Sequence, residues 1–251
     1  MKTADLKQYR ITGTINANMS IIGIPINANI PMDFRLKLNA DNTVQSAYIN
    51  LDVPYFIGVL QQDMTAKVYY EDGVLYFDRN WETSTGALWW KEYYDHHEYM
   101  KCTIDEFMAN PMKYVYFCTN FTSMVVNAIN DAIAKSDQKA VRTGNIMFEE
   151  ALTGFHYNGS NQWNVNLDAA HLINNSDFSD QMSITVGKGS NGILNSISLS
   201  TRVLDMINLQ LNNGQLVNAD KSNVDMSVIP TGLSSNPNYV FGEVKVVETK
   251  K

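Results

Sequence analysis

The most constraining feature of the sequence is a long alternation of apolar and polar residues near its N-terminus. Between Ile11 and Ile21 the odd positions are apolar or glycine, and the even positions are Thr, Asn or Ser. After Gly23 the phase changes, and from Ile24 to Leu38 the even positions are apolar. Period-two alternation of this length is typical of strands with one buried and one solvated face. We therefore expect a broad, strongly curved antiparallel sheet.

The same period continues in shorter segments along the chain. A hairpin is predicted over residues 66–77, with Asp72-Gly73 as its two-residue turn. Asn213-Gly214 is predicted to be another turn, with a strand before it and a strand after it. Further alternating runs lie at residues 47–53, 155–167, 182–186, 197–199, 207–211 and 224–228.

The middle of the chain has a different pattern. Thr103 and Glu106 have the spacing of a capping box, which predicts a helix from Ile104, and Pro111 predicts that this helix is short, kinked or broken. A second helix is predicted over about residues 120–135, where apolar residues recur at helical spacing. Strands joined by tight turns on both sides of these helices indicate an α+β fold with an antiparallel meander sheet.

This layout resembles the bacterial lipoprotein-carrier superfamily, the LolA/LolB and LppX-like proteins. The resemblance rests on the two opening strands, on the Tyr-x-x-Gly-x-x-Tyr pattern of residues 70–76, and on the run 163–168 that precedes a short helix and a closing meander. It implies a strongly curved antiparallel half-barrel whose concave face is covered by central helices. Residues 1–251 would form a single domain, with a helical and aromatic insertion at about 80–140.

The resemblance also implies a function. We expect a non-catalytic, extracytoplasmic lipoprotein-type domain, at the cell surface or in the periplasm, that binds a lipid or another hydrophobic ligand between sheet and helices. Its signal peptide and lipid anchor would not be part of this chain. The candidate pocket residues have large apolar side chains on the expected buried faces or in the aromatic segment: Met19, Ile30, Met32, Phe34, Leu36, Phe77, Trp89, Trp90, Phe121, Met124, Met182 and Met226.

The alternative is a structural or surface-interaction module whose core is filled by its own side chains and holds no ligand. The aromatic cluster of residues 81–94 fits either reading, because such residues fill a core as well as they line the mouth of a pocket, contact a membrane or stack on sugars. Cys102 and Cys118 either form one disulfide or are two buried free thiols.

Several function classes are disfavoured by composition and motif content. The formal net charge of -7 gives no basic surplus for a nucleic-acid partner. Charged residues make up 18% of the chain, because asparagine occupies many polar positions instead. No cofactor, metal or catalytic residue is predicted: His96 and His97, with Glu98 and Cys102 nearby, do not have the spacing of a closed zinc site. No apolar run reaches 18 residues, so no membrane-spanning helix is expected.

Overall fold

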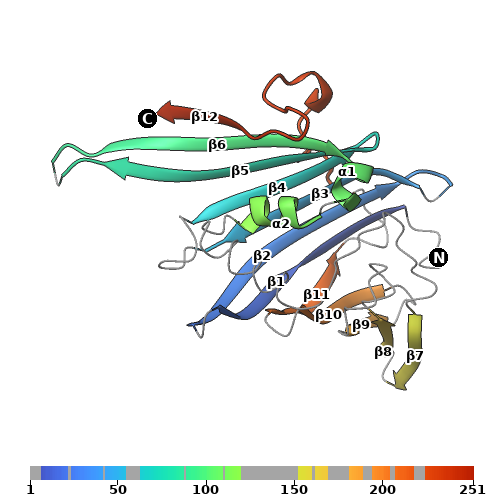
Figure 1. The fold of residues 1–251 in the computed structure, drawn as a ribbon. Helices are drawn as coiled ribbons and strands as arrows, with labels where there is room; N and C mark the ends of the chain where they lie inside the picture. The colour runs from blue at the N-terminus through green and yellow to red at the C-terminus, as the bar shows by residue number, and fades with distance from the viewer. Residues whose placement is uncertain are drawn as a thin grey trace.

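The fold is an open antiparallel sheet. The computed structural model describes residues 7–21, 24–41, 43–54, 63–87, 89–109, 111–119, 152–159, 162–168, 181–188, 194–203, 207–217 and 224–251. Twelve strands form one sheet in the order β12-β6-β5-β4-β3-β2-β1-β11-β10-β9-β8-β7 (Figure 1). Within these described residues β12 and β7 are the two edges. Each pair of neighbouring strands is antiparallel, which confirms the expected antiparallel sheet.

The strand bounds follow the predicted alternation closely at the N-terminus and less closely elsewhere. The strands are β1 (Gln8–Ile21), β2 (Ile24–Leu38), β3 (Val44–Val53), β4 (Met64–Glu71), β5 (Val74–Thr85), β6 (Glu92–Thr103), β7 (Leu152–Gly159), β8 (Gln162–Asp168), β9 (Gln181–Lys188), β10 (Leu194–Val203), β11 (Ile207–Val217) and β12 (Lys245–Lys250). The predicted turn at Asp72-Gly73 joins β4 to β5, and both residues have positive φ angles, as tight hairpin turns of this kind require.

Strand β1 joins the two halves of the chain. Strands β1 to β6 form one meander and β7 to β11 another, and β1 pairs with both β2 and β11. Ile15, for example, pairs with Ile30 on one side and with Leu211 on the other. The C-terminal strand β12 passes to the far edge and pairs with β6.

The register of the meander places apolar residues opposite one another. We use the name apolar row for six residues that pair in succession from β1 to β6: Ile11, Phe34, Ile49, Val68, Phe77 and Met100. Because side chains alternate between the two faces of a strand, partners in such a row share one face of the sheet. Five hairpin connections therefore build one continuous apolar face.

Two short helices cover part of that face, which we call the helix face. Helix α1 (Ile104–Ala109) begins with the predicted capping box: Thr103 N donates to Glu106 Oε2 at 2.7 Å, and Glu106 N donates to Thr103 Oγ1 at 3.2 Å. Helix α2 (Pro111–Thr119) begins at Pro111, so the predicted helix break is confirmed. The helices predicted at about 120–135 and after Asp168 lie outside the described residues.

The opposite face, which we call the C-terminal face, is covered by residues 224–244. Tyr48, Tyr69 and Tyr76 lie side by side on β3, β4 and β5, and Leu233 and Tyr239 pack on them. Leu233 begins the short 3-10 helix η2 (Leu233–Ser235). Both faces of this part of the sheet are therefore covered, the helix face by α2 and the C-terminal face by an irregular segment.

Three of the predictions about local structure were wrong. The aromatic stretch that we placed in a helical insertion forms strands β5 and β6, because both faces of this hairpin carry rings and polar groups and the period of two is hidden. The predicted turn at Asn213-Gly214 lies inside β11, where register shifts in both flanking pairings absorb the irregularity. Residues 224–228, predicted as a strand, form none.

Candidate functional site

Five of the predicted pocket residues lie on the helix face. Ile30, Met32, Phe34 and Leu36 lie on β2 at alternate positions and Phe77 lies on β5, so all five are on the helix face. Burial divides them into two groups. Phe77 is 2% exposed, whereas the four β2 side chains are only partly buried.

The fully buried group is a self-filled core. Phe77 packs with Met100 and Cys102 of β6, and Tyr114 and Phe117 of α2 cover them. The Phe77 and Tyr114 rings are stacked with centroids 5.1 Å apart. Helix α2 therefore covers the helix face over β5 and β6 with its own side chains.

A charged group anchors the end of α2 to the sheet. Arg79 Nε donates to Glu98 Oε2 at 2.6 Å, and Arg79 Nη1 donates to the carbonyl oxygen of Phe117 at 2.8 Å. The guanidinium carbon lies 4.3 Å from the Phe117 ring centroid, which is a cation–π contact. Arg79 and Glu98 are direct register partners on β5 and β6 and are mostly buried. The pair fixes where α2 ends on the helix face.

The other predicted pocket residues are distributed over the molecule. Trp89 and Trp90 lie in the turn between β5 and β6 and are 86% and 64% exposed, so they do not line the covered part of the helix face. Met226 lies in the C-terminal segment, on the side of the opposite face. Met19 and Met182 are positions of β1 and β9. The remaining two, Phe121 and Met124, lie outside the described residues.

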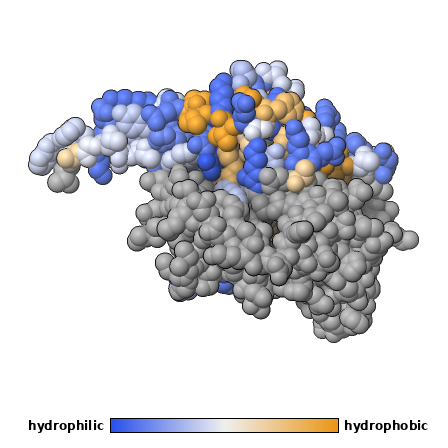
Figure 2. Space-filling model, in the orientation of Figure 1, coloured by the Kyte–Doolittle hydropathy of each residue, from blue (hydrophilic) through white to orange (hydrophobic). Residues whose placement is uncertain are grey.

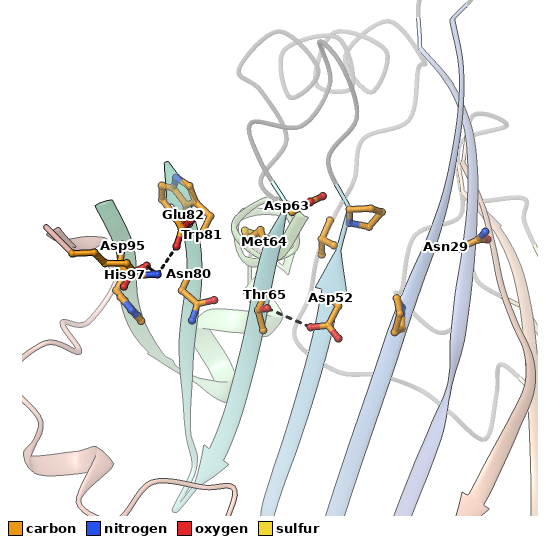
Figure 3. Close-up of a pocket in the computed structure, with 14 residues that line it drawn as sticks. Asn29, Asp52, Asp63, Met64, Thr65, Asn80, Trp81, Glu82, Asp95 and His97 are labelled. Carbon is orange, nitrogen blue, oxygen red and sulfur yellow. Dashed lines mark hydrogen bonds and ion pairs between the residues drawn. The ribbon is translucent and has the colours of Figure 1, made fainter. Parts of the chain in front are cut away.

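The C-terminal face carries a cleft of about 680 Å³ near the ends of β3 and β4, and both polar and apolar side chains line it (Figure 3). Its floor is formed by side chains at matching positions on four strands: Asp52, Thr65, Asn80 and His97. Lys251 closes one side and pairs with both Glu82 and Asp95, at 2.9 Å to Asp95 Oδ1. The lining is rich in carboxylates, and two of these are already neutralised by this lysine.

A mostly buried aspartate, Asp78, lies beside His97 of the cleft floor. Asp78 Oδ1 is 3.9 Å from His97 Nδ1, and neither atom has a hydrogen-bond partner. Burial raises the pKa of the Asp78 carboxyl, and the nearby His97 and Lys67 partly oppose this shift. The separation is too long for a hydrogen bond, so the pair is not an aligned acid–base dyad.

His96 faces the helix side of the sheet and has both ring nitrogens engaged. Thr83 Oγ1 is 2.6 Å from Nε2, Glu248 Oε2 is 3.2 Å from Nδ1, and the ring stacks on Trp81. The three groups come from β5, β6 and β12. Their order is that of a hydroxyl–imidazole–carboxylate relay, but His96 is not among the residues that line the cleft. The contacts hold β12 against β6.

Metal and membrane features were also sought in the described part of the chain. No three His, Cys, Asp or Glu side chains there are grouped so that they would share a metal ion. No helix there has both the length and the apolar character needed to span a bilayer. Cys102 and Cys118 are both free thiols, which settles the two alternatives left by the sequence.

Comparison with protein-family models, with curated proteins and with solved structures gave no match to this chain. The residues that sequence reasoning missed are Arg79, Glu98, Asp78 and Lys251. Arg79 and Glu98 are 19 positions apart, and only the register of the β5–β6 hairpin brings them together. An Arg at an inward position of a strand is a signal that could have found the first of them.

Proposed function

We propose that the protein is a non-catalytic binding protein with a half-barrel fold that holds an apolar ligand between the helix face of the sheet and the helices over its concave side. By the resemblance described above, it would act outside the cytoplasm as a lipid-anchored protein. The observation that carries the proposal is the uneven burial of the apolar row. Phe77 and Met100 are fully covered, and Ile11, Phe34 and Ile49 are only partly covered.

The physical argument concerns the cost of an incompletely covered apolar face. A partly buried Phe or Met side chain forgoes part of the roughly 1.5–3 kcal/mol that full burial provides. Several such side chains lie next to one another on β1, β2 and β3, at Ile11, Ile30, Met32, Phe34 and Ile49. An acyl chain or a similar apolar molecule lying along this face would complete their burial. Contiguous apolar surface is typical of binding sites.

The second candidate function is a surface-interaction module with no ligand. It is favoured by the core beneath α2, where Phe77, Met100, Cys102, Tyr114 and Phe117 fill the helix face without any added molecule. The two functions differ in one respect that is easily measured, which is whether an apolar compound accompanies the purified protein.

The test combines extraction with a binding titration. We expect native mass spectrometry of the intact protein to show an additional mass that organic extraction removes, and the extracted protein to bind a fluorescent fatty-acid analogue. The variant M32Q places an amide of similar size on the helix face and should weaken that binding by about fivefold or more. The matched control N29Q alters an exposed residue on the other face of the same strand.

The outcomes separate the two functions. Equal binding by the wild type and N29Q, with weakened binding by M32Q, supports a ligand on the helix face. No extractable compound and no analogue binding would leave the surface-interaction module as the function. Binding that is unchanged in M32Q would place the ligand elsewhere and contradict the proposal.

A further inference from the structure

The β5–β6 hairpin extends beyond the end of its neighbour β4. The last residue pair between β4 and β5 is Thr65 with Asn80, whereas β5 and β6 continue to pair as far as Thr85 with Glu92. The five additional rows place the turn about 16 Å past the end of β4 at 3.3 Å per residue. We call residues 81–96 the arm, and Figure 1 shows it projecting past β4 and away from α1 and α2.

The tip of the arm exposes two adjacent tryptophans. Trp89 is 86% exposed and Trp90 is 64% exposed, and Tyr93 at the start of β6 is 42% exposed. Indole is the largest side chain available and carries one N–H donor, so two adjacent exposed indoles present a large amphipathic surface. Figure 2 colours most of the arm blue to white, the hydrophilic half of the scale. Trp81, Tyr94 and His96 of the arm are partly buried, whereas its strongly exposed rings are those of Trp89, Trp90 and Tyr93.

The backbone of the tip is held in one shape. Gly86 has a φ of +100°, and a Cβ at this position would lie 2.1 Å from the carbonyl oxygen of Trp90. Trp90 N also donates to the carbonyl oxygen of Ala87 at 2.8 Å. The backbone of Trp90 therefore lies close to that of Gly86 and Ala87. A side chain other than hydrogen at position 86 would open the turn.

The charges along the arm are balanced by ion pairs. Lys250 Nζ is 2.5 Å from Glu92 Oε1, and Lys251 pairs with both Glu82 and Asp95. Three carboxylates of the arm are therefore matched by two lysines at the end of the chain, and Lys91 lies beside Trp90. The arm has no strong excess of either charge with which to select a charged partner.

We propose that the tip of the arm is a contact surface for the interfacial region of a phospholipid bilayer. Tryptophan favours this region because its ring is apolar and its N–H can donate to ester and phosphate oxygens. The convex tip fits a soft surface that closes around it. The polar arm behind it limits insertion to the two indoles. This inference does not depend on the ligand proposed for the helix face.

The same features disfavour the two other partners of exposed aromatic residues. A sugar-binding platform needs polar groups beside the ring to pair with hydroxyls, and the cleft with such groups lies at the base of the arm rather than at its tip. A protein pocket would have to match two adjacent indoles on a convex turn. A protein partner would be the interpretation if the protein does not bind lipid vesicles.

The experiment uses the full chain and vesicles of phosphatidylcholine alone. We expect the wild type to sediment with the vesicles and its tryptophan emission to shift to shorter wavelength. We expect W89S/W90S to lose about tenfold or more in partitioning. Because both residues are exposed, this variant should unfold at the same temperature as the wild type. Binding should persist in about 0.5 M salt, where surface electrostatics are screened.

Two control variants make the result specific. V246S removes another exposed apolar side chain, that of Val246 on β12, which is 58% exposed, and should partition like the wild type. M32Q should also partition normally, because the helix face is not the contact surface, so failure of one proposal does not imply failure of the other. A wild type that does not bind these vesicles, W89S/W90S that binds equally well, or binding that requires anionic lipid and low salt would each overturn the inference.

Discussion

The buried pair of Arg79 and Glu98 allows a quantitative test of how α2 is held on the sheet. The side chains of Arg79 and Glu98 are 15% and 14% exposed. Removing one partner of a buried ion pair leaves a desolvated charge, which costs about 3–5 kcal/mol. Arg79 also donates to the Phe117 carbonyl, so R79M removes that hydrogen bond as well. We expect R79M to lower the free energy of unfolding by about 3–5 kcal/mol.

The reciprocal variant is expected to be milder. In E98M the guanidinium keeps its hydrogen bond to Phe117 and its contact with the ring of that residue, so a loss of about 2–3 kcal/mol is expected. The double variant R79M/E98M has neither charge and places two flexible apolar side chains opposite each other. The double variant should lose less free energy of unfolding than R79M alone. The coupling energy of the cycle should therefore reach at least about 2 kcal/mol.

Urea unfolding monitored by circular dichroism gives the free energies of unfolding of the wild type and the three variants. The dependence of this free energy on urea concentration must be the same for all four proteins. Repeating the measurement at about 0.5 M salt should leave the coupling almost unchanged, since a buried pair is weakly screened. Losses that simply add in the double variant would refute the reasoning, because they would mean that the two side chains do not interact in solution.

Two further predictions concern titratable groups. Burial raises the pKa of Asp78, so the folded state binds its proton more tightly than the unfolded state, and this contribution to stability is lost as pH rises through the raised pKa. As the pH rises above the ordinary value of about 3.8, D78N should therefore lose less stability than the wild type. Urea midpoints that fall in parallel with pH for the two proteins would contradict this. Burial raises the pKa of the Cys118 thiol to about 12, and also raises that of Cys102. Both thiols should react slowly with a chromogenic disulfide in the native protein and rapidly in urea, and a fast native reaction would contradict the burial.

The sequence predicts the elements whose signal is local. The alternation from Ile11 to Leu38 located β1 and β2, Asp72-Gly73 located the β4–β5 hairpin, and Thr103 with Glu106 located the start of α1. Each of these patterns reflects an interaction between residues that are close in the chain. Burial of one strand face, a left-handed turn and a capping box all leave their mark within a few positions.

The features that were missed depend on residues distant in the chain. β12 carries no alternation that identifies it, and its position follows only from pairing with β6 about 150 residues earlier. The cleft on the C-terminal face brings together residues from five strands with Lys251 at the end of the chain. Trp89 and Trp90 are exposed because β5 and β6 extend beyond the end of β4. The sequence of the hairpin alone does not show how much longer it is than β4.

The strand order also has a consequence for the way in which the chain acquires its structure. Strands β1 to β6 pair with sequence neighbours, so this meander can form from local hairpins soon after it is synthesised. On its C-terminal face, Tyr48, Tyr69 and Tyr76 become buried only when residues 224–244 have been synthesised and pack on them. Until then these side chains form an exposed apolar surface on the incomplete sheet. Such transiently exposed apolar surface makes the partly folded chain prone to aggregation while it is being synthesised.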